Sequence, residues 1–183
     1  QVTGGIAFVF PGSGSHFAEM GRELGLQWPE ILRAQDRENQ FLASQMFADR
    51  FWNPAPGGGG VKDHRALICG QVALGAMVSD LAVHFGIKPD AVIGYSLGES
   101  TGLFALRAWT SRDEMLQRVS SSTLFTQDLV GTPEMLRRAW HLPSGQFVAW
   151  KCGLVDCAVD EVRKAIAGRE RIYVLIVNTP GEC

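Results

Sequence analysis

The sequence predicts an α/β fold organised around a parallel sheet. Residues 6–10 and 91–94 are short apolar runs that each end at a turn, which is typical of strands buried on both faces of such a sheet. Between them, apolar residues recur at three- and four-residue steps over 63–85 and predict one long buried helix. Strands that alternate with helices are the pattern of α/β proteins.

Size and composition narrow the class of protein. With 183 residues, 46% of them hydrophobic, the chain is long enough for one full core and a smaller appended unit. A net charge of −2 and scattered basic residues argue against nucleic-acid binding. Asp80 and His84 interrupt the apolar stretch 70–87, so we expect no membrane span; without a leader we expect a cytoplasmic protein. The four cysteines lack zinc or redox spacing, which predicts free thiols and no metal site.

The first quarter of the chain is expected to hold one strand followed by helices. The strand 6–10 stops at a glycine-rich loop over 11–16, and a helix begins at Phe17. Pro29 suits the first position of a further helix, because its missing N–H has no partner there, and 31–51 is expected to be helical.

The middle of the chain repeats this pattern. Prolines and glycines over 53–60 predict a surface loop before the helix 63–85. The strand 91–94 leads, through a turn, into a helix that ends at about Arg107. Ser111, three residues before a glutamate, predicts a capping box and a helix that continues to about residue 127.

The C-terminal part has the pattern of one β-α-β unit. A strand, a helix and a second strand are predicted over 146–150, 157–167 and 172–177. Asp156 is the predicted N-cap of the helix. We therefore predict two domains, 1–143 and 144–183. Because the chain starts without methionine and stops within a turn, we expect it to be a piece of a larger protein.

The strongest chemical signal is the G-x-S-x-G turn at residues 94–98. Gly94 and Gly98 permit a sharp strand-to-helix turn, so that the hydroxyl of Ser96 stands clear of the sheet at a helix N-terminus. A serine in this position is suited to attack an acyl carbon. Ser96 is therefore the candidate nucleophile.

Two loops together resemble those of the malonyl-CoA:acyl-carrier-protein acyltransferases. Residues 10–16 resemble the family's F-P-G-Q-G-S-Q loop, and 94–99 resemble its G-H-S-L-G-E elbow. Residues 86–93 look like the lead-in to the family's serine, and 177–180 like its Asn-Ser-Pro turn. Within the superfamily, the residues around the serine are most similar to acyltransferase domains of polyunsaturated-fatty-acid and polyketide synthases.

The resemblance implies a fold and a reaction. It implies an α/β-hydrolase-like large subdomain and the beginning of a ferredoxin-like small subdomain. An acyl group would pass from CoA to Ser96 and then to the phosphopantetheine thiol of an acyl carrier protein, and the backbone N–H groups of Leu97 and Ser13 would bind the oxyanion. Acyl-CoA and the carrier protein are then substrates rather than bound cofactors. The other domains of a fatty-acid or polyketide synthase are expected partners.

The general base is the first departure from the family pattern. The family's catalytic histidine lies beyond the ferredoxin-like insert, which places it after the last residue of this chain. His84, near the end of the helix 63–85, is interpreted as structural, and His141 as solvent-exposed. His16, in the glycine loop, is the remaining candidate, although the family has Gln there.

The acyl-binding residues are the second departure. Malonyl-selective members use an arginine whose planar fork holds the free carboxylate, and the matching position here is Ser121, or Ser122 with a one-residue slip. A neutral acyl group is therefore expected. Tyr95 replaces the usual histidine before the nucleophile and would reshape the acyl pocket, and His64 falls near the family's active-site glutamine on the preceding helix.

Two alternative functions remain open from the sequence. A serine hydrolase such as a thioesterase would use the same elbow with water as the acceptor, but its acid and histidine should follow the serine in that order, and His141 precedes two of the available aspartates. A non-catalytic domain that docks carrier proteins would explain the missing arginine and histidine. The intact elbow argues against it.

Overall fold

The computed structural model describes residues 4–53, 63–128 and 134–183, which form two compact units divided between Gly131 and Thr132. Most of the loop predicted over 53–60 lies outside the described residues. Helix α8 (Glu134–Ala139) groups with the C-terminal unit, whereas the sequence prediction placed the domain boundary after residue 143.

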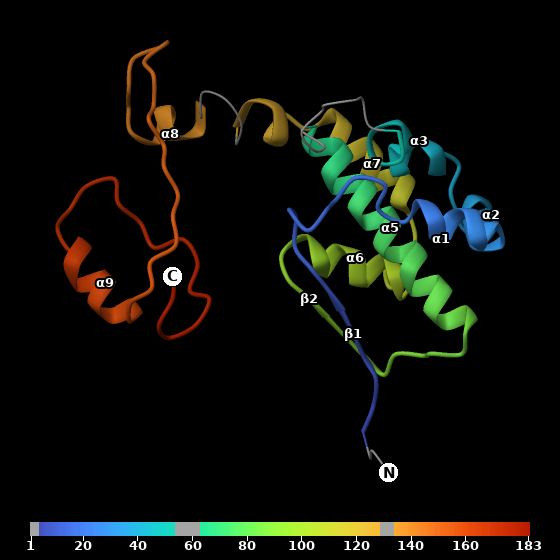
Figure 1. The fold of residues 1–183 in the computed structure, drawn as a ribbon. Helices are drawn as coiled ribbons and strands as arrows, with labels where there is room; N and C mark the ends of the chain where they lie inside the picture. Colours follow the sequence, from blue (N-terminus) through green and yellow to red (C-terminus); the bar gives the residue numbers. More distant parts are fainter. Residues whose placement is uncertain (1–3, 54–62, 129–133) are drawn as a thin grey trace. The chain divides into compact units, whose positions relative to one another are not determined.

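A parallel two-stranded sheet lies at one side of the N-terminal unit (Figure 1). Val9 and Ile93 on its strands are 70% and 60% exposed, so the expectation of strands buried on both faces was wrong. Strands β1 (Ala7–Phe10) and β2 (Ala91–Gly94) pair in the register Ala7↔Ala91 to Phe10↔Gly94. Helix α6 (Leu97–Ala105) packs closely on the sheet at Gly102, which has no side chain. A Cβ added there would lie only 2.8 Å from a methyl group of Val92. The predicted α/β class with a parallel sheet is confirmed.

The described part of the segment between β1 and the long helix predicted over 63–85 contains four helices. They are α1 (Arg22–Gln27), α2 (Pro29–Glu38), α3 (Leu42–Met46) and α4 (Ala48–Phe51). The prediction of a helix that begins at Phe17 was therefore wrong, because α1 begins at Arg22. The prediction of one helix over 31–51 was also wrong, although Pro29 does begin α2. The chain is extended at Asn39 and left-handed at Phe47, and the carboxylate of Asp113 binds the amide N–H groups of Gln40 and Phe41 at the first break.

Helix α5 (His64–His84) carries the core of this unit, as the sequence predicted for 63–85. Two apolar residues of the predicted buried pattern, Val78 and Phe85, are nevertheless exposed to solvent. Burial raises the pKa of the Cys69 thiol to about 11. Although α5 is long and apolar enough to cross a membrane, 61% of its most apolar window is buried within the protein, as in a core helix. The core cluster joins four residues of this helix to four from the helices before it: Ala73, Leu74, Met77 and Leu81 pack with Ile31, Leu42, Met46 and Phe51.

The first turn of α5 is capped by Asp63, whose carboxylate accepts hydrogen bonds from the amides of Arg65 and Ala66. Burial alone would raise the pKa of Asp63, but these bonds and the charge of Arg65 lower it. Asp63→Ala is expected to reduce the free energy of unfolding by about 1 kcal/mol. Because the folded pKa is lowered, this contribution is present above the unfolded pKa and is lost as the pH falls through the folded value. Urea unfolding of both proteins at pH 7 and at pH 3 measures it; an equal difference at both values would contradict the cap.

An ion cluster fixes the end of α6. The chain turns left-handed at Arg107, whose guanidinium binds both oxygens of Asp80 on α5, at 2.7 and 2.9 Å, and also Glu38 on α2. Helix α6 therefore ends at residue 105, slightly before the predicted 107.

Helix α7 (Arg112–Ser121) begins at the predicted cap, where the Ser111 hydroxyl accepts a hydrogen bond from the Glu114 amide. It ends before the predicted residue 127, and a π-helical turn (Leu124–Asp128) follows.

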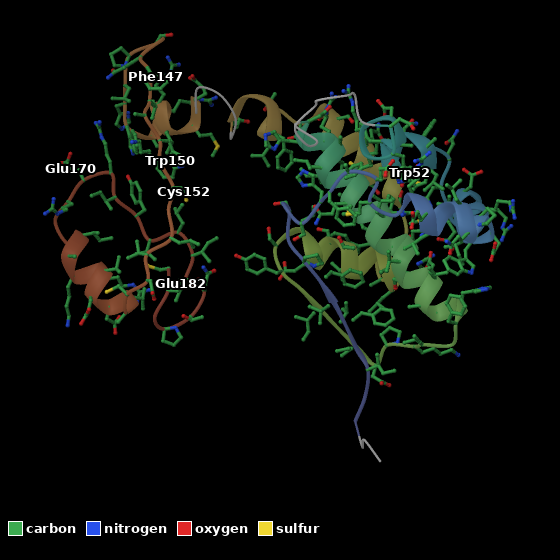
Figure 2. All side chains as sticks on the ribbon, viewed as in Figure 1. Trp52, Phe147, Trp150, Cys152, Glu170 and Glu182 are labelled. Carbon is green, nitrogen blue, oxygen red and sulfur yellow. The ribbon has the colours of Figure 1, made fainter. Side chains whose placement is uncertain are left out.

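The C-terminal unit contains α8 and α9 (Val159–Ile166). The two strands predicted over 146–150 and 172–177 are not formed in its described part, where isolated bridges join only residues 156, 179 and 182. An apolar β-branched pattern favours extended backbone, but a strand also requires a hydrogen-bonded neighbour. The N-cap of α9 is Ala158, so the prediction of Asp156 was wrong. Figure 2 shows the side chains of this unit, including the exposed Phe147.

Candidate active site

The two loops singled out in the sequence meet at one edge of the sheet. Because β1 and β2 are parallel, the glycine loop after Phe10 and the turn after Gly94 leave from the same carboxyl end. The pairing continues into the turn, where the Tyr95 amide donates a hydrogen bond to the Phe10 carbonyl at 3.1 Å. Ligands of open α/β sheets bind at such carboxyl edges.

Ser96 occupies a sharp, strained turn between β2 and α6. Its backbone has φ 52° and ψ −118°, a conformation that L-residues rarely adopt. Ser96 precedes the first residue of α6, but its side chain makes no capping hydrogen bond, and the residue is exposed. The hydroxyl group is therefore presented to solvent at the positive end of a nine-residue helix.

The two elbow glycines are required by close backbone approach. A Cβ added to Gly94 would clash with the backbone of Gly98 and Glu99. A Cβ added to Gly98 would clash with the Phe10 carbonyl group and lie 2.8 Å from the Pro11 oxygen. Side chains cannot fit at either position, because backbone atoms rather than flexible side chains fill the space. The structure thus supplies the physical reason for the G-x-S-x-G spacing.

The glycine loop lies against the elbow. A Cβ added to Gly12 would be 3.4 Å from the Cβ of Ser96 and 2.9 Å from a ring carbon of Tyr95. On its other side, the Nε2 of Gln71 donates a hydrogen bond of 2.7 Å to the Gly12 carbonyl. The sequence pattern places Gln71 in the core stripe of the helix 63–85, and only the tertiary structure brings it to this loop.

The predicted oxyanion-binding amides belong to this arrangement. Leu97 is the first residue of α6, and an amide in that position has no carbonyl partner within its own helix. The next two amides, of Gly98 and Glu99, bond back to the carbonyls of Tyr95 and Ser96. Ser13 follows Gly12 in the exposed part of the glycine loop. Leu97 therefore follows the nucleophile directly in the chain. Ser13 follows Gly12, the glycine that lies against Ser96.

None of the four histidines hydrogen-bonds to Ser96 in the part of the chain that the structure describes. His16 is half-buried and packs edge-on against Phe51, with its Nδ1 atom buried and without a hydrogen-bond partner among the described residues. His64 is exposed at the first residue of α5. The side chain of α5 that reaches the glycine loop is that of Gln71, two turns further along the helix.

The residues expected to contact the acyl group have different surroundings. Tyr95 is 63% exposed and its ring lies against Gly12, so it belongs to the elbow region. Ser121 is the last residue of α7, where its exposed hydroxyl donates to the carbonyl of Arg118. Arg118 itself pairs with Glu114 on the surface. Among the described residues, neither His64 nor Ser121 hydrogen-bonds to the side chain of Ser96.

Sequence comparisons identify similar regions in much longer enzymes. No protein-family model matches the chain. It is 33% identical over 194 residues to one subunit of the phenolphthiocerol/phthiocerol polyketide synthase of Mycobacterium tuberculosis, a match that covers 95% of the chain but 9% of that protein. It is 34% identical over 113 residues to the malonyl CoA-acyl carrier protein transacylase of Bacillus subtilis, covering 59% of the chain and 33% of the transacylase.

Solved structures share the fold over nearly the whole chain. The acyl transferase domain of ZmaA matches with a TM-score of 0.63 and 23% identity, over 100% of this chain and 40% of the solved one. The acyltransferase domain of PpsC from Mycobacterium tuberculosis matches with a TM-score of 0.60 and 24% identity, over 99% and 49%. A malonyl-transacylase in complex with a type II polyketide acyl-carrier protein matches with a TM-score of 0.55 and 15% identity. The chain thus spans half or less of the first two solved chains.

Proposed function

We propose that this chain, which is similar to part of a polyketide synthase subunit and of a malonyl CoA-acyl carrier protein transacylase, is an acyltransferase domain of the transacylase-like family. In this proposal it transfers an acyl group from CoA to an acyl-carrier-protein thiol through an acyl-Ser96 intermediate. The observation that carries this proposal is the left-handed Ser96 at the carboxyl edge of the sheet, in contact with the glycine loop. Few other roles account for a strained, exposed serine in this position.

The proposed reaction has two half-steps. The Ser96 oxygen attacks the thioester carbon, the C–S bond breaks, and CoA leaves as a thiolate that takes up a proton. The carrier-protein thiol then attacks the acyl-serine, and the serine oxygen is released with a proton. In both half-steps the amides of Leu97 and Ser13 would bind the negative oxygen. A base must accept the Ser96 proton, and the family resemblance assigns this to a histidine that follows the ferredoxin-like insert.

The proposal is tested by the intact mass of the chain after exposure to acetyl-, malonyl- and long-chain acyl-CoA. Each reaction is run with and without free imidazole, which can replace a histidine base. We expect one acyl adduct that is absent from Ser96→Ala. Delivery of the acyl group to a phosphopantetheine thiol identifies a transferase, and release to water identifies a hydrolase. No adduct with any donor in either condition contradicts the proposal and favours a docking domain.

We further propose that the acyl group is neutral. The family's carboxylate-binding arginine is replaced by Ser121, whose hydroxyl bonds to its own helix, and the neighbouring Arg118 is occupied by Glu114. A free carboxylate would therefore lose a charge-assisted pair of hydrogen bonds. Acetyl or a longer fatty chain makes no such demand. Tyr95, which packs on Gly12 beside the nucleophile, would form one wall of the acyl pocket, whereas the exposed His64 is the weaker candidate for contact.

Restoring the arginine is expected to shift the donor preference. Ser121→Arg should raise the ratio of malonyl to acetyl loading on Ser96 about tenfold, the value of one charge-assisted contact. The ratio is measured by competition between the two CoA esters. Ser120→Arg, which adds the same charge on a neighbouring face of α7, is the matched control and should leave the ratio within about twofold. An equal shift in both variants would mean that general charge, rather than position 121, determines the preference.

The setting of this activity follows from the same resemblance. We propose a place in a polyketide synthase or a polyunsaturated-fatty-acid synthase, with an acyl carrier protein and the other synthase domains as partners. One solved structure of this fold is itself bound to an acyl-carrier protein. Acyl-CoA and the phosphopantetheinyl carrier would serve as substrates, and the cytoplasm, where such substrates are made, would be the location.

A further inference from the structure

A buried glutamine contacts the loop that carries one of the two oxyanion-binding amides. Gln71 is only 6% exposed, and its Nε2 donates a hydrogen bond to the carbonyl of Gly12 across 59 residues of sequence. The carbonyl cannot donate, so the amide nitrogen of the side chain must face it. Its Oε1 is buried and has no hydrogen-bond partner among the described residues. The side chain is therefore held on the loop by one bond.

That bond acts on the peptide unit that contains the Ser13 amide. The Gly12 carbonyl and the Ser13 N–H belong to one planar trans peptide, so they point in opposite directions and rotate together. A hydrogen bond that fixes the carbonyl direction also fixes the N–H direction. It further polarises the peptide and strengthens its N–H as a donor.

Without this bond the peptide unit would rotate easily. Gly12 has no side chain to restrict its backbone, and Gly14, two residues further on, has φ +100°. The Tyr95 ring and the Ser96 Cβ limit the space around the Cα of Gly12, and the side chain of Gln71 binds its carbonyl. Gln71 is thus the group that selects one orientation of the 12–13 peptide.

We propose that Gln71 is a positioning residue that aims the Ser13 amide at the oxyanion, acting through the Gly12 carbonyl. The inference rests on the proposed acyl transfer through Ser96. It makes Gln71 important for the rate of the chemical step rather than for donor binding, because the oxyanion forms only as the carbon is attacked.

The test compares Gln71→Met with Gln45→Met. Gln45 is a matched control, because it is also a buried glutamine that donates to one acceptor, Asp113, and has an Oε1 without a partner among the described residues. It belongs to α3 and not to the elbow region. We expect Gln71→Met to lower the maximal rate of Ser96 acylation about 100-fold, with the half-saturating donor concentration within about twofold. Gln45→Met should leave the maximal rate within about threefold.

A spectroscopic readout separates this inference from the function on which it rests. The carbonyl ¹³C shift of Gly12 and the amide ¹⁵N shift of Ser13 should change in Gln71→Met and not in Gln45→Met. If both variants lower the acylation rate equally, or if the two shifts are unaffected by Gln71→Met, the inference is overturned. If the wild-type chain forms no acyl-Ser96, the transfer proposal fails, and the shifts alone still decide whether Gln71 orients this peptide.

Discussion

Replacing Ser96 with glycine is expected to stabilise the folded chain while abolishing acyl transfer. Ser96 has φ 52° and ψ −118°, and such a conformation costs an L-residue about 1–3 kcal/mol. Glycine removes that cost but loses about 0.4–1 kcal/mol through its freer unfolded state. The net expectation is a gain of about 1 kcal/mol in the free energy of unfolding. The acylation rate should fall by about four orders of magnitude or more, because no nucleophile remains.

The measurements are urea unfolding and the intact mass after exposure to acyl-CoA. Ser96→Ala is the matched control, because it also removes the hydroxyl but keeps the Cβ that creates the strain. Its stability should stay within about 0.5 kcal/mol of the wild type. A Ser96→Gly chain no more stable than Ser96→Ala would contradict the strain at the elbow. A surviving adduct in either variant would contradict Ser96 as the nucleophile.

Gly98→Ala is expected to destabilise the elbow and impair catalysis together. Its Cβ would lie 2.7 Å from the Phe10 carbonyl carbon and 2.8 Å from the Pro11 oxygen. These are backbone atoms at the end of β1, so relief requires α6 to move away from the strand. We expect the free energy of unfolding to fall by about 3 kcal/mol, as in strongly overpacked cores. The acylation rate should fall about 100-fold, because a displacement of about 1 Å misplaces the reacting atoms.

Gly153→Ala is the control for the loss of a glycine. Gly153 has no heavy atom within 4 Å of an added Cβ, and its φ is not in the left-handed range. Its replacement should leave the stability within about 0.5 kcal/mol and leave acylation unchanged. Urea unfolding and adduct formation are measured for both variants. A Gly98→Ala chain as stable and active as Gly153→Ala would contradict the close contact between α6 and the glycine loop.

Local patterns predicted the elements whose signals are contained in a few consecutive residues. The strand 91–94, the capping serine at 111 and the proline that begins α2 are of this kind, and each is present in the structure. Some of the predictions that failed depended on distant partners. The break between α2 and α3 is stabilised by Asp113, from a helix more than 70 residues later, so no pattern within 31–51 announces it.

The difference between local patterns and distant contacts also explains why His64 was predicted on α5 and Gln71 was not. The family resemblance pointed to the start of α5 and to His64, but the first residue of that helix is exposed. The residue that reaches the glycine loop is Gln71, and its polar side chain within an apolar helix was the available signal. Helical periodicity indicates which side chains share a face. It does not indicate which loop that face will meet.

The sequence alone determined the α/β class, the order of β1, α5, β2 and α6, and Ser96 as the candidate nucleophile. These follow from residue types at short spacings, because steric limits on glycine turns and the periods of helices and strands are local properties. The tertiary structure alone decided that the Gly12 loop lies against Ser96 and that Gln71 binds the Gly12 carbonyl. Those contacts join segments separated by at least 59 residues, and their geometry is set by the parallel register and by the packing of α5 and α6.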